Sequence, residues 1–305
     1  MLRFLIRRLG VAVAVALTVS ILTFGLTNLA SDPAIAMAGD TASAAEIQRI
    51  REQFGFDRPL PVQYVDWLTS AMRGDFGYSY RLRRPVSELI ATRLPVTMAL
   101  GGAALTFAIV LAIPMGVIAA LRPNSWIDRT ALTIAVFGQA MPTFWFALMM
   151  MLVFSVWLGW LPASGGATWW HFIMPAVALG YYATPAFMRL TRAGMLEVMR
   201  ADYIRTARAK GLHPRVVVFK HALRNAIIPV VSLAAVQFGF MLGGSVVIET
   251  LFSMPGLGYL AWQSISRADL PVVQAIVLVI ALIYVVLTLL ADLLNAWFDP
   301  RVRLS

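Results

Sequence analysis

The chain contains no cysteine and only three histidines. A disulfide framework and a thiolate metal site are therefore excluded. His171, His213 and His221 lie far apart in the sequence and do not indicate a histidine-rich metal site. Charged residues are also scarce, at 13% of 305 residues, whereas hydrophobic residues make up 60%. Soluble domains are usually roughly 45–50% apolar, so this composition predicts a polytopic membrane protein.

Nucleotide-binding and catalytic motifs are absent as well. The sequence has no G-x-x-x-x-G-K-[ST] loop, no H-E-x-x-H and no G-x-S-x-G. No carboxylate pair lies within an apolar run. We therefore expect no enzymatic activity, no catalytic residue, no metal site and no cofactor bound by this chain. Any ATP and Mg that drive its function would be bound by another chain.

Long apolar runs are what the sequence does have. A membrane-spanning helix needs about 20 mostly apolar residues. Proline inside such a helix is tolerated with a kink, which we expect at Pro114, Pro142 and Pro229. The predicted fold is all-α and polytopic, with six transmembrane helices at residues 9–29, 97–121, 131–158, 172–188, 226–248 and 272–290.

The first apolar run could also be a signal peptide, cleaved near Ala34-Ile35-Ala36. Its apolar stretch is longer than the roughly 7–15 residues usual in such a peptide, so we predict an uncleaved span. With six spans both termini share one side of the membrane. That side carries the basic clusters Arg3, Arg7 and Arg8, Arg122 and Arg129, residues 189–224, and Arg301 and Arg303.

This distribution of charge predicts the orientation. Cytoplasmic loops are enriched in Lys and Arg, so we expect both termini in the cytoplasm and the chain in a bacterial inner (plasma) membrane. The same distribution accounts for the net charge of +10, which leaves no reason to expect a nucleic-acid partner.

The predicted organisation has four parts. Residues 1–29 form a cytoplasmic stub and the first span, and residues 30–94 form a periplasmic cap inserted between the first two spans. Residues 46–54 and 64–72 of the cap are expected to be amphipathic helices, and Gly74–Gly77 a turn. Residues 95–295 form the core with five spans and a cytoplasmic hairpin at 197–224, and residues 296–305 a cytoplasmic tail.

The hairpin is predicted from a basic run broken near its middle. Residues 197–210 suit a helix that Gly211 ends, and Pro214 suits the first turn of a second helix. Val216, Phe219 and Leu223 would form one apolar stripe on that helix. Two interpretations remain open: an element that docks another protein, or a basic loop that binds anionic membrane lipid.

The hairpin sequence resembles the signature loop of type I ABC-transporter permeases, written E-A-A-x3-G-x9-I-x-L-P. Aligned on Gly211, the second Ala is Ala207 and the Leu is Leu223. The chain departs from the motif at Arg205, Thr206, His221 and Arg224.

The segments DYIRTARAKG and KHALRNAIIPV resemble the B-type permeases of dipeptide, oligopeptide, glutathione and nickel importers. Further similar motifs are GDFGYS at 74–79, RRPV at 83–86, RLPVTMAL at 93–100, ETLFSMPGLG at 249–258 and DPRVR at 299–303.

The resemblance implies a type I ABC importer permease fold and a set of partners. These are a second, homologous permease subunit, two ATP-binding cassette subunits that bind ATP and Mg, and a periplasmic or lipid-anchored solute-binding protein. It also implies that the hairpin couples to one ATPase through Tyr203, Ala207, Gly211 and Leu212. Arg205, Arg208 and Lys210 are expected to pair with acidic residues of the ATPase.

Polar residues at membrane depth are the candidates for a translocation pathway. Gln139, next to Met141, and Gln237 would either form interhelical hydrogen bonds or line the path. Glu249 and Asp269 would either contact a substrate or binding protein at the outer mouth or be solvated loop charges. Pro255, Gly256 and Gly258 would form either an outer gate or a plain turn.

The predicted function is a transmembrane subunit of an ATP-driven importer of dipeptides or oligopeptides. Nickel or glutathione import by the same architecture is the alternative. A different class, the ion-coupled secondary transporter, would need carboxylates or discontinuous helices near the membrane centre. The middles of the predicted spans contain no acidic residue.

Overall fold

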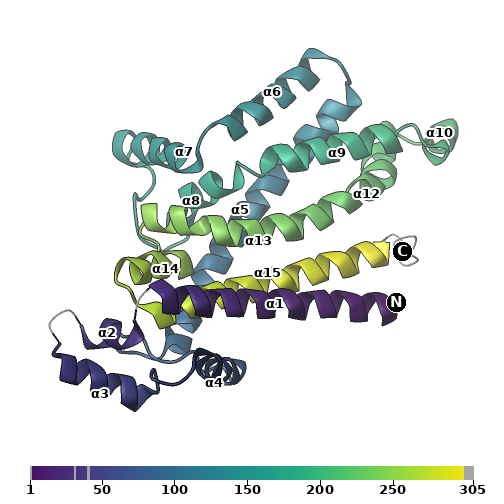
Figure 1. Cartoon of the computed structure of the whole chain (residues 1–305). Coiled ribbons are helices and arrows are strands. Elements are labelled where there is room, and N and C mark those ends of the chain that lie inside the picture. The colour runs from purple at the N-terminus through teal and green to yellow at the C-terminus, as the bar shows by residue number, and fades with distance from the viewer. Residues whose placement is uncertain (1, 31, 40–41, 299–305) are drawn as a thin grey trace. The chain divides into compact units, whose positions relative to one another are not determined.

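The computed structural model describes residues 2–30, 32–39 and 42–298 (Figure 1). Within these ranges the chain is helical and has no strand, apart from an isolated antiparallel bridge between Tyr78 and Pro85. It forms two compact units. Of the described residues, unit 1 contains 98–253 and 287–298, and unit 2 contains 2–97 and 254–286.

Unit 2 begins with α1 (Leu2–Ala30), which two short helices and a longer one follow. These are α2 (Pro33–Ala38), α3 (Ala44–Phe54) and α4 (Leu60–Met72), which contain the amphipathic helices predicted at 46–54 and 64–72. Side chains cap the starts of α2 and α3, because Asp32 and Ser43 accept hydrogen bonds from backbone N–H groups two and three residues on.

Aromatic contacts join α4 to α1. The hydroxyl groups of Ser20 and Tyr64 lie 2.7 Å apart, and the Phe24 ring packs edge-on against Tyr64. The turn predicted at Gly74–Gly77 is present. Both glycines have positive φ, and the Gly77 N–H donates to the Asp75 carboxylate.

The rest of unit 2 differs from the predicted boundaries. Helix α5 (Val86–Leu121) starts at Val86 rather than Thr97, because its first turns bury apolar side chains against two later helices. These are α14 (Leu257–Ser266), which the sequence did not predict, and α15 (Leu270–Phe298). Residues 254–286 therefore pack with the segment predicted as a separate cap.

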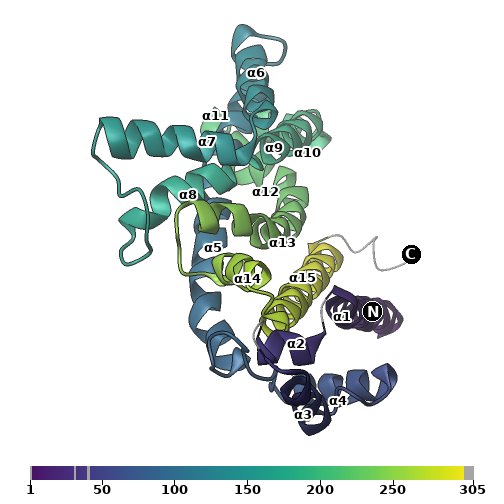
Figure 2. The same cartoon turned by 60° about the vertical axis from the view of Figure 1, so that its left-hand side comes forward.

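Two of the predicted spans are interrupted. The third consists of α6 (Trp126–Ala140), α7 (Thr143–Met150) and a π-helical segment η1 (Met151–Trp157). Met141 is extended at the break because a residue before proline avoids the helical region. The fourth consists of α8 (Trp170–Gly180) and α9 (Thr184–Val198) with a turn between them. Figure 2 shows α7 and α8 side by side.

Among the described residues, four helices are long and apolar enough to cross a membrane: Ile6–Leu29, Val86–Leu121, Ile228–Leu251 and Leu270–Leu294. Thr143–Trp157 and Trp170–Gly180 are shorter apolar helices at the places of the third and fourth spans. The all-α polytopic fold is thus confirmed. The third and fourth predicted spans are interrupted rather than only kinked, at Pro142 and at 181–183.

Close packing in unit 1 depends on small residues. A Cβ added at Gly180 would lie 2.3 Å from the carbonyl oxygen of Ala104, so α8 approaches the α5 backbone where only glycine fits. Helix α13 (Ile228–Leu251) packs against α7, α8 and α9. Of the predicted tail 296–305, residues 296–298 are the end of α15 and the rest lie outside the described residues. The DPRVR motif at 299–303 lies wholly outside them.

Candidate functional site

The predicted hairpin lies beyond the end of α9 in unit 1 (Figure 1). Its first helix is α10 (Asp202–Ala209), separated from α9 by a bend, so residues 197–210 do not form the single helix predicted. Ala201, the residue before α10, has an extended backbone with ψ of 150°, so the helical path of α9 does not continue into α10.

The corner of the hairpin has the predicted geometry. Gly211 has φ of +75°, the left-handed conformation that favours glycine, and its N–H donates to the Arg208 carbonyl. Pro214 lies in the first turn of the returning segment, where the His213 side chain accepts a hydrogen bond from the Arg215 N–H. That segment consists of α11 (Pro214–Val216), the π-helical η2 (Val217–Ala222) and α12 (Leu223–Ala226).

The inner face of the hairpin is locked into unit 1. One buried cluster joins α9, α10 and the returning segment. It contains Met195 of α9, Ile204 of α10, and Val217, Val218, Ala222 and Ala226. Of the predicted stripe, Leu223 packs against this cluster, whereas Val216 and Phe219 are exposed, Phe219 by 61%. A π-helix has a wider turn than an α-helix, so the buried face moves to Val217 and Val218.

The outer face carries nearly all of the predicted coupling residues. Tyr203 is 43% and Leu212 39% exposed, and Arg205, Arg208, Lys210 and Gly211 are exposed as well. Ala207 differs from the rest: it is only 7% exposed and packs inside the hairpin. The Asn225 side chain donates to the Tyr203 hydroxyl at 2.8 Å and so positions that ring.

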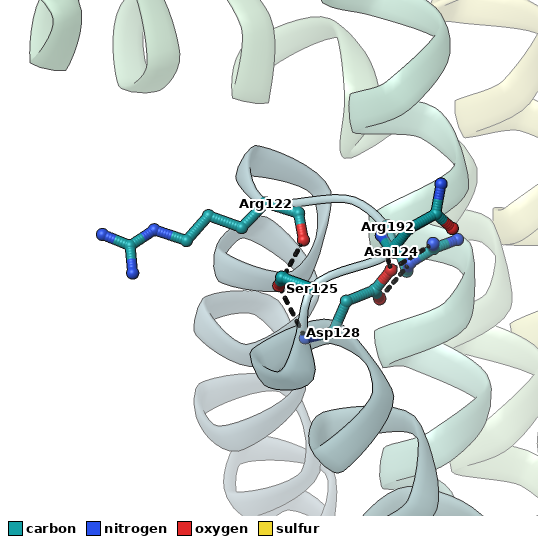
Figure 3. Close-up of polar contacts among 5 residues, drawn as sticks. All are labelled: Arg122, Asn124, Ser125, Asp128 and Arg192. Carbon is teal, nitrogen blue, oxygen red and sulfur yellow. Dashed lines mark hydrogen bonds and ion pairs between the residues drawn. The ribbon is translucent and has the colours of Figure 1, made fainter.

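A buried ion pair joins α6 to α9 (Figure 3). The Arg192 guanidinium donates from Nε and Nη2 to the two carboxylate oxygens of Asp128, each at 2.7 Å. The Asn124 N–H also donates to Asp128 at 2.9 Å, and Ser125 caps the helix at the Asp128 N–H. Bonding to Arg192 and Asn124 lowers the pKa of Asp128, and burial opposes this only in part.

Sequence reasoning missed this pair, although part of its signal was visible. Ser125 and Asp128 have the spacing of a capping box, which marks a helix start just there. Nothing in the sequence links Asp128 to Arg192, which is 64 residues away in the chain. The pair fixes α9, the helix that leads into the hairpin, to the start of α6.

Two pathway candidates lie where the interrupted helices meet. The Tyr181 hydroxyl donates to the Met141 carbonyl at 2.6 Å, which satisfies an acceptor freed by the break before Pro142. Gln139 donates to the Tyr182 carbonyl at 3.5 Å and accepts from Arg189 Nη1 at 3.3 Å. Gln139 therefore has the interhelical hydrogen bonds that were one of its two alternatives.

The other pathway candidates are more scattered. Gln237 is half-buried in α13. Glu249, near the end of α13, is fully buried, so the interpretation as a solvated loop charge was wrong. Asp269 is buried too, since its carboxylate accepts hydrogen bonds from the Ser79 hydroxyl and from the N–H groups of Tyr80 and Arg81. These bonds hold the loop before α5 to the start of α15.

The predicted outer gate is the start of a helix. Gly256 and Gly258 are buried, Pro255 is half-buried, and the Leu257 N–H donates to the Thr97 hydroxyl at 2.8 Å. The segment is therefore a fixed entry into α14 rather than a plain solvated turn. A gating role for it stays a prediction. In the part of the chain that the structure describes, no three acidic, histidine or cysteine side chains come together as metal ligands.

Comparisons with known proteins cover nearly the whole chain. Residues 112–304 match the family described as binding-protein-dependent transport system inner membrane component, and residues 1–101 match its N-terminal family. The glutathione transport system permease protein GsiC of Pectobacterium atrosepticum is 42% identical over 304 residues, or 99% of each chain. GsiC of Escherichia coli (strain K12) is equally similar.

Solved structures show the same fold. A chain of the inward-facing MetNI methionine ABC transporter matches with a TM-score of 0.54 and 23% identity, over 71% of this chain and 95% of that one. A chain of an amino acid ABC transporter crystallised with histidines matches with a TM-score of 0.51 and 19% identity, over 70% and 94%.

Discontinuous helices near the membrane centre were one of two features expected of a secondary transporter, and this chain has interrupted helices at Pro142 and at 181–183. They do not decide the class, because the sequence match does so over the full length. The chain belongs to the binding-protein-dependent transport system inner membrane components, the permease family of ABC importers.

Proposed function

We propose that the chain is one of two permease subunits of an ABC importer for glutathione or a related small peptide. A homologous permease, two ATPase subunits that bind ATP and Mg, and an external solute-binding protein complete the transporter. Both termini and the hairpin lie in the cytoplasm. The substrate assignment is supported by relatives 42% identical to this chain, the glutathione transport system permease proteins GsiC.

The observation that carries the coupling role is the two-sided hairpin. Its inner face is buried in unit 1, whereas Tyr203, Leu212 and the cations Arg205, Arg208 and Lys210 are exposed on the other side. A partner that pushes on the exposed face displaces α9 as well, because Met195 of α9 belongs to the same buried cluster. A flexible basic loop would not transmit such a displacement.

A route from the hairpin to the pathway follows from the ion pair. Motion of α9 passes through Arg192 and Asp128 to α6, which ends at the break near Met141. The turn at 181–183 lies against the same break through the Tyr181 hydroxyl. These two interruptions are the hinges at which helix halves reorient between the outward-open and inward-open states.

Arg189 and Gln139 supply polar groups for the substrate at this level. Glutathione carries two carboxylates and amide groups, and Arg binds carboxylates with charge-assisted hydrogen bonds. The Arg189 side chain is exposed within unit 1, and its bond to Gln139 is long at 3.3 Å. It can therefore exchange that bond for one to a passing carboxylate.

The test is transport by the complete complex in vesicles. With the cognate binding protein outside the vesicles and ATP inside them, labelled glutathione should accumulate in the lumen and should raise the rate of ATP hydrolysis. Uptake of a dipeptide or of nickel in place of glutathione would reassign the substrate and keep the importer. Uptake driven by an ion gradient without ATP would overturn the proposal.

A further inference from the structure

Unit 2 contains a cavity of about 640 Å³ that the transport mechanism does not use. Its walls come from the last turns of α1, from α2, α3 and α4, from the loop before α5 and from the first turns of α15. Small-molecule sites usually enclose about 300–1,000 Å³, so the cavity is large enough for a ligand.

The lining combines aromatic rings with a comparable number of polar side chains, among them Thr27, Gln63 and Ser70. Phe24, Phe56, Trp67 and Phe76 contribute rings. Tyr80 also lines it, and burial followed by the charge of Asp269 raises the pKa of Tyr80 to about 12. The rings suit an apolar part of a ligand, and the polar side chains between them suit its polar groups.

One polar group in the wall lacks a partner. Gln274 of α15 lines the cavity and is only 7% exposed, and its Nε2 is buried without a hydrogen bond in the described structure. A buried donor without a partner is unfavourable, because it loses its bonds to water and gains none in return. The terminal amide torsion is soft, so a ligand acceptor in the cavity can capture the donor by rotating it.

The position of the cavity narrows the class of ligand. Phe24 and Thr27 lie near the end of the candidate span Ile6–Leu29, and Gln274 lies in the first turns of the candidate span Leu270–Leu294. The cavity therefore lies where the hydrocarbon core of the bilayer gives way to the headgroups. Aromatic residues such as Trp67 and Tyr80 are typical of that level.

A cation is available beside the cavity for a phosphate. Arg58 lines the cavity and pairs with Asp66 at 2.9 Å, and both side chains are about half exposed. The Arg58 guanidinium packs over Gly55, where an added Cβ would meet its Nη2 at 2.4 Å. Guanidinium has five N–H donors, so the pair with Asp66 leaves others for a second acceptor.

We propose that this cavity binds a membrane phospholipid. One acyl chain fills the aromatic lining, an ester carbonyl accepts a hydrogen bond from the Gln274 amide, and the phosphate lies at Arg58. The lipid thereby joins the helices that follow α1 to the start of α15. This role is independent of substrate identity and does not depend on the hairpin.

The test uses the complete transporter in nanodiscs that contain a phosphatidylethanolamine with a photoreactive group in one acyl chain. After illumination, mass spectrometry of peptides should find the label on α4 near Trp67 and on residues 76–80. Gln274→Leu should reduce this labelling roughly fivefold, which corresponds to the loss of about 1 kcal/mol. Gln48→Leu, on exposed α3 surface away from the cavity lining, is the matched control and should leave it unchanged.

Filling the cavity gives a second variant. Ser70→Trp should abolish labelling of the lining and should leave lipid labels elsewhere on α1 unchanged. This variant tests the proposal if the transporter with Gln274→Leu does not assemble. Equal labelling in Ser70→Trp and the unmodified protein would overturn the proposal. Loss of the label on adding free phosphate or a peptide, with the lipid content unchanged, would also overturn the proposal. The occupant of the cavity would then be an anion or a polypeptide segment.

Discussion

At the residue scale, the ion pair between Asp128 and Arg192 is the polar contact on which the proposed coupling route depends. Asp128 is buried and accepts from both Arg192 and the Asn124 N–H. Asp128→Asn would leave Arg192 with a neutral partner in a largely buried place. We expect it to lower the free energy of unfolding by roughly 2–4 kcal/mol.

Thermal unfolding of the purified permease measures this loss. Arg129→Gln removes an exposed neighbouring charge in the same turn and should change the melting temperature little. Equal effects of Asp128→Asn and Arg129→Gln would show that the pair adds nothing to stability.

The pH dependence of the same pair has a defined sign. Arg192 lowers the pKa of Asp128 in the folded protein below its unfolded value of about 3.9. The stabilisation is therefore complete above the unfolded pKa and is lost as pH falls through the folded pKa. The difference in melting temperature between the unmodified protein and Asp128→Asn should be constant near neutral pH and shrink below about pH 4. A difference that grew with acidification would contradict this assignment.

Arg189 is expected to act on the substrate rather than on stability. Arg189→Ala removes one long hydrogen bond to Gln139 and one proposed contact with a carboxylate. The half-saturating glutathione concentration for uptake should rise about tenfold, which corresponds to about 1.4 kcal/mol. Arg189→Lys keeps the charge and should recover part of the affinity. Unchanged uptake by Arg189→Ala would remove this residue from the pathway.

At the element scale, the contact of α8 with α5 depends on the absence of a side chain at Gly180. Gly180→Ala would place a carbon 2.3 Å from the Ala104 carbonyl oxygen, and backbone cannot move away as a side chain can. We expect a loss of about 1–3 kcal/mol of stability. Gly102→Ala in α5 is the matched control, since a Cβ there meets nothing within 4 Å. A neutral Gly180→Ala in unfolding measurements would mean that the two helices pack less closely.

The hairpin also shows which elements the sequence can predict. Gly211 and Pro214 were placed correctly because each local conformation depends on one residue type. The apolar stripe was partly misplaced because η2 is π-helical, and hydrophobic spacing assumes an α-helical period. Ala207 was expected at a partner surface, and only the tertiary packing shows it inside the hairpin.

The effect of proline on the helices was predicted only in part, since a kink was expected at each of three prolines. Pro114 lies within the continuous α5, and Pro229 lies in the first turn of α13, whereas Pro142 ends a helix. The break at Pro142 is stabilised by a residue far away in the sequence. The Tyr181 hydroxyl donates a hydrogen bond to the Met141 carbonyl, which the break leaves without a helical partner. No local pattern identifies such a partner.

At the scale of the whole molecule, composition and apolar runs predicted the class, and separated motifs predicted the family. Contacts between distant segments could not be predicted. The burial of Glu249 and Asp269, the helix α14 and the packing of 254–286 with the first 97 residues all arise from such contacts. A charged residue in a short loop is expected to be exposed to solvent. Asp269 is instead buried, and three donors from the loop before α5 form hydrogen bonds with its carboxylate.

The absence of cysteine makes the central claim directly measurable. A single Leu212→Cys substitution places one thiol on the exposed corner of the hairpin, and Met72→Cys places one on exposed α4 surface. With a photoreactive maleimide in the assembled transporter, position 212 should crosslink to an ATPase subunit and position 72 should not. A membrane-impermeant thiol reagent should label position 212 only in inverted vesicles. Labelling of position 212 from the cell exterior, or crosslinking without any ATPase adduct, would contradict the coupling account.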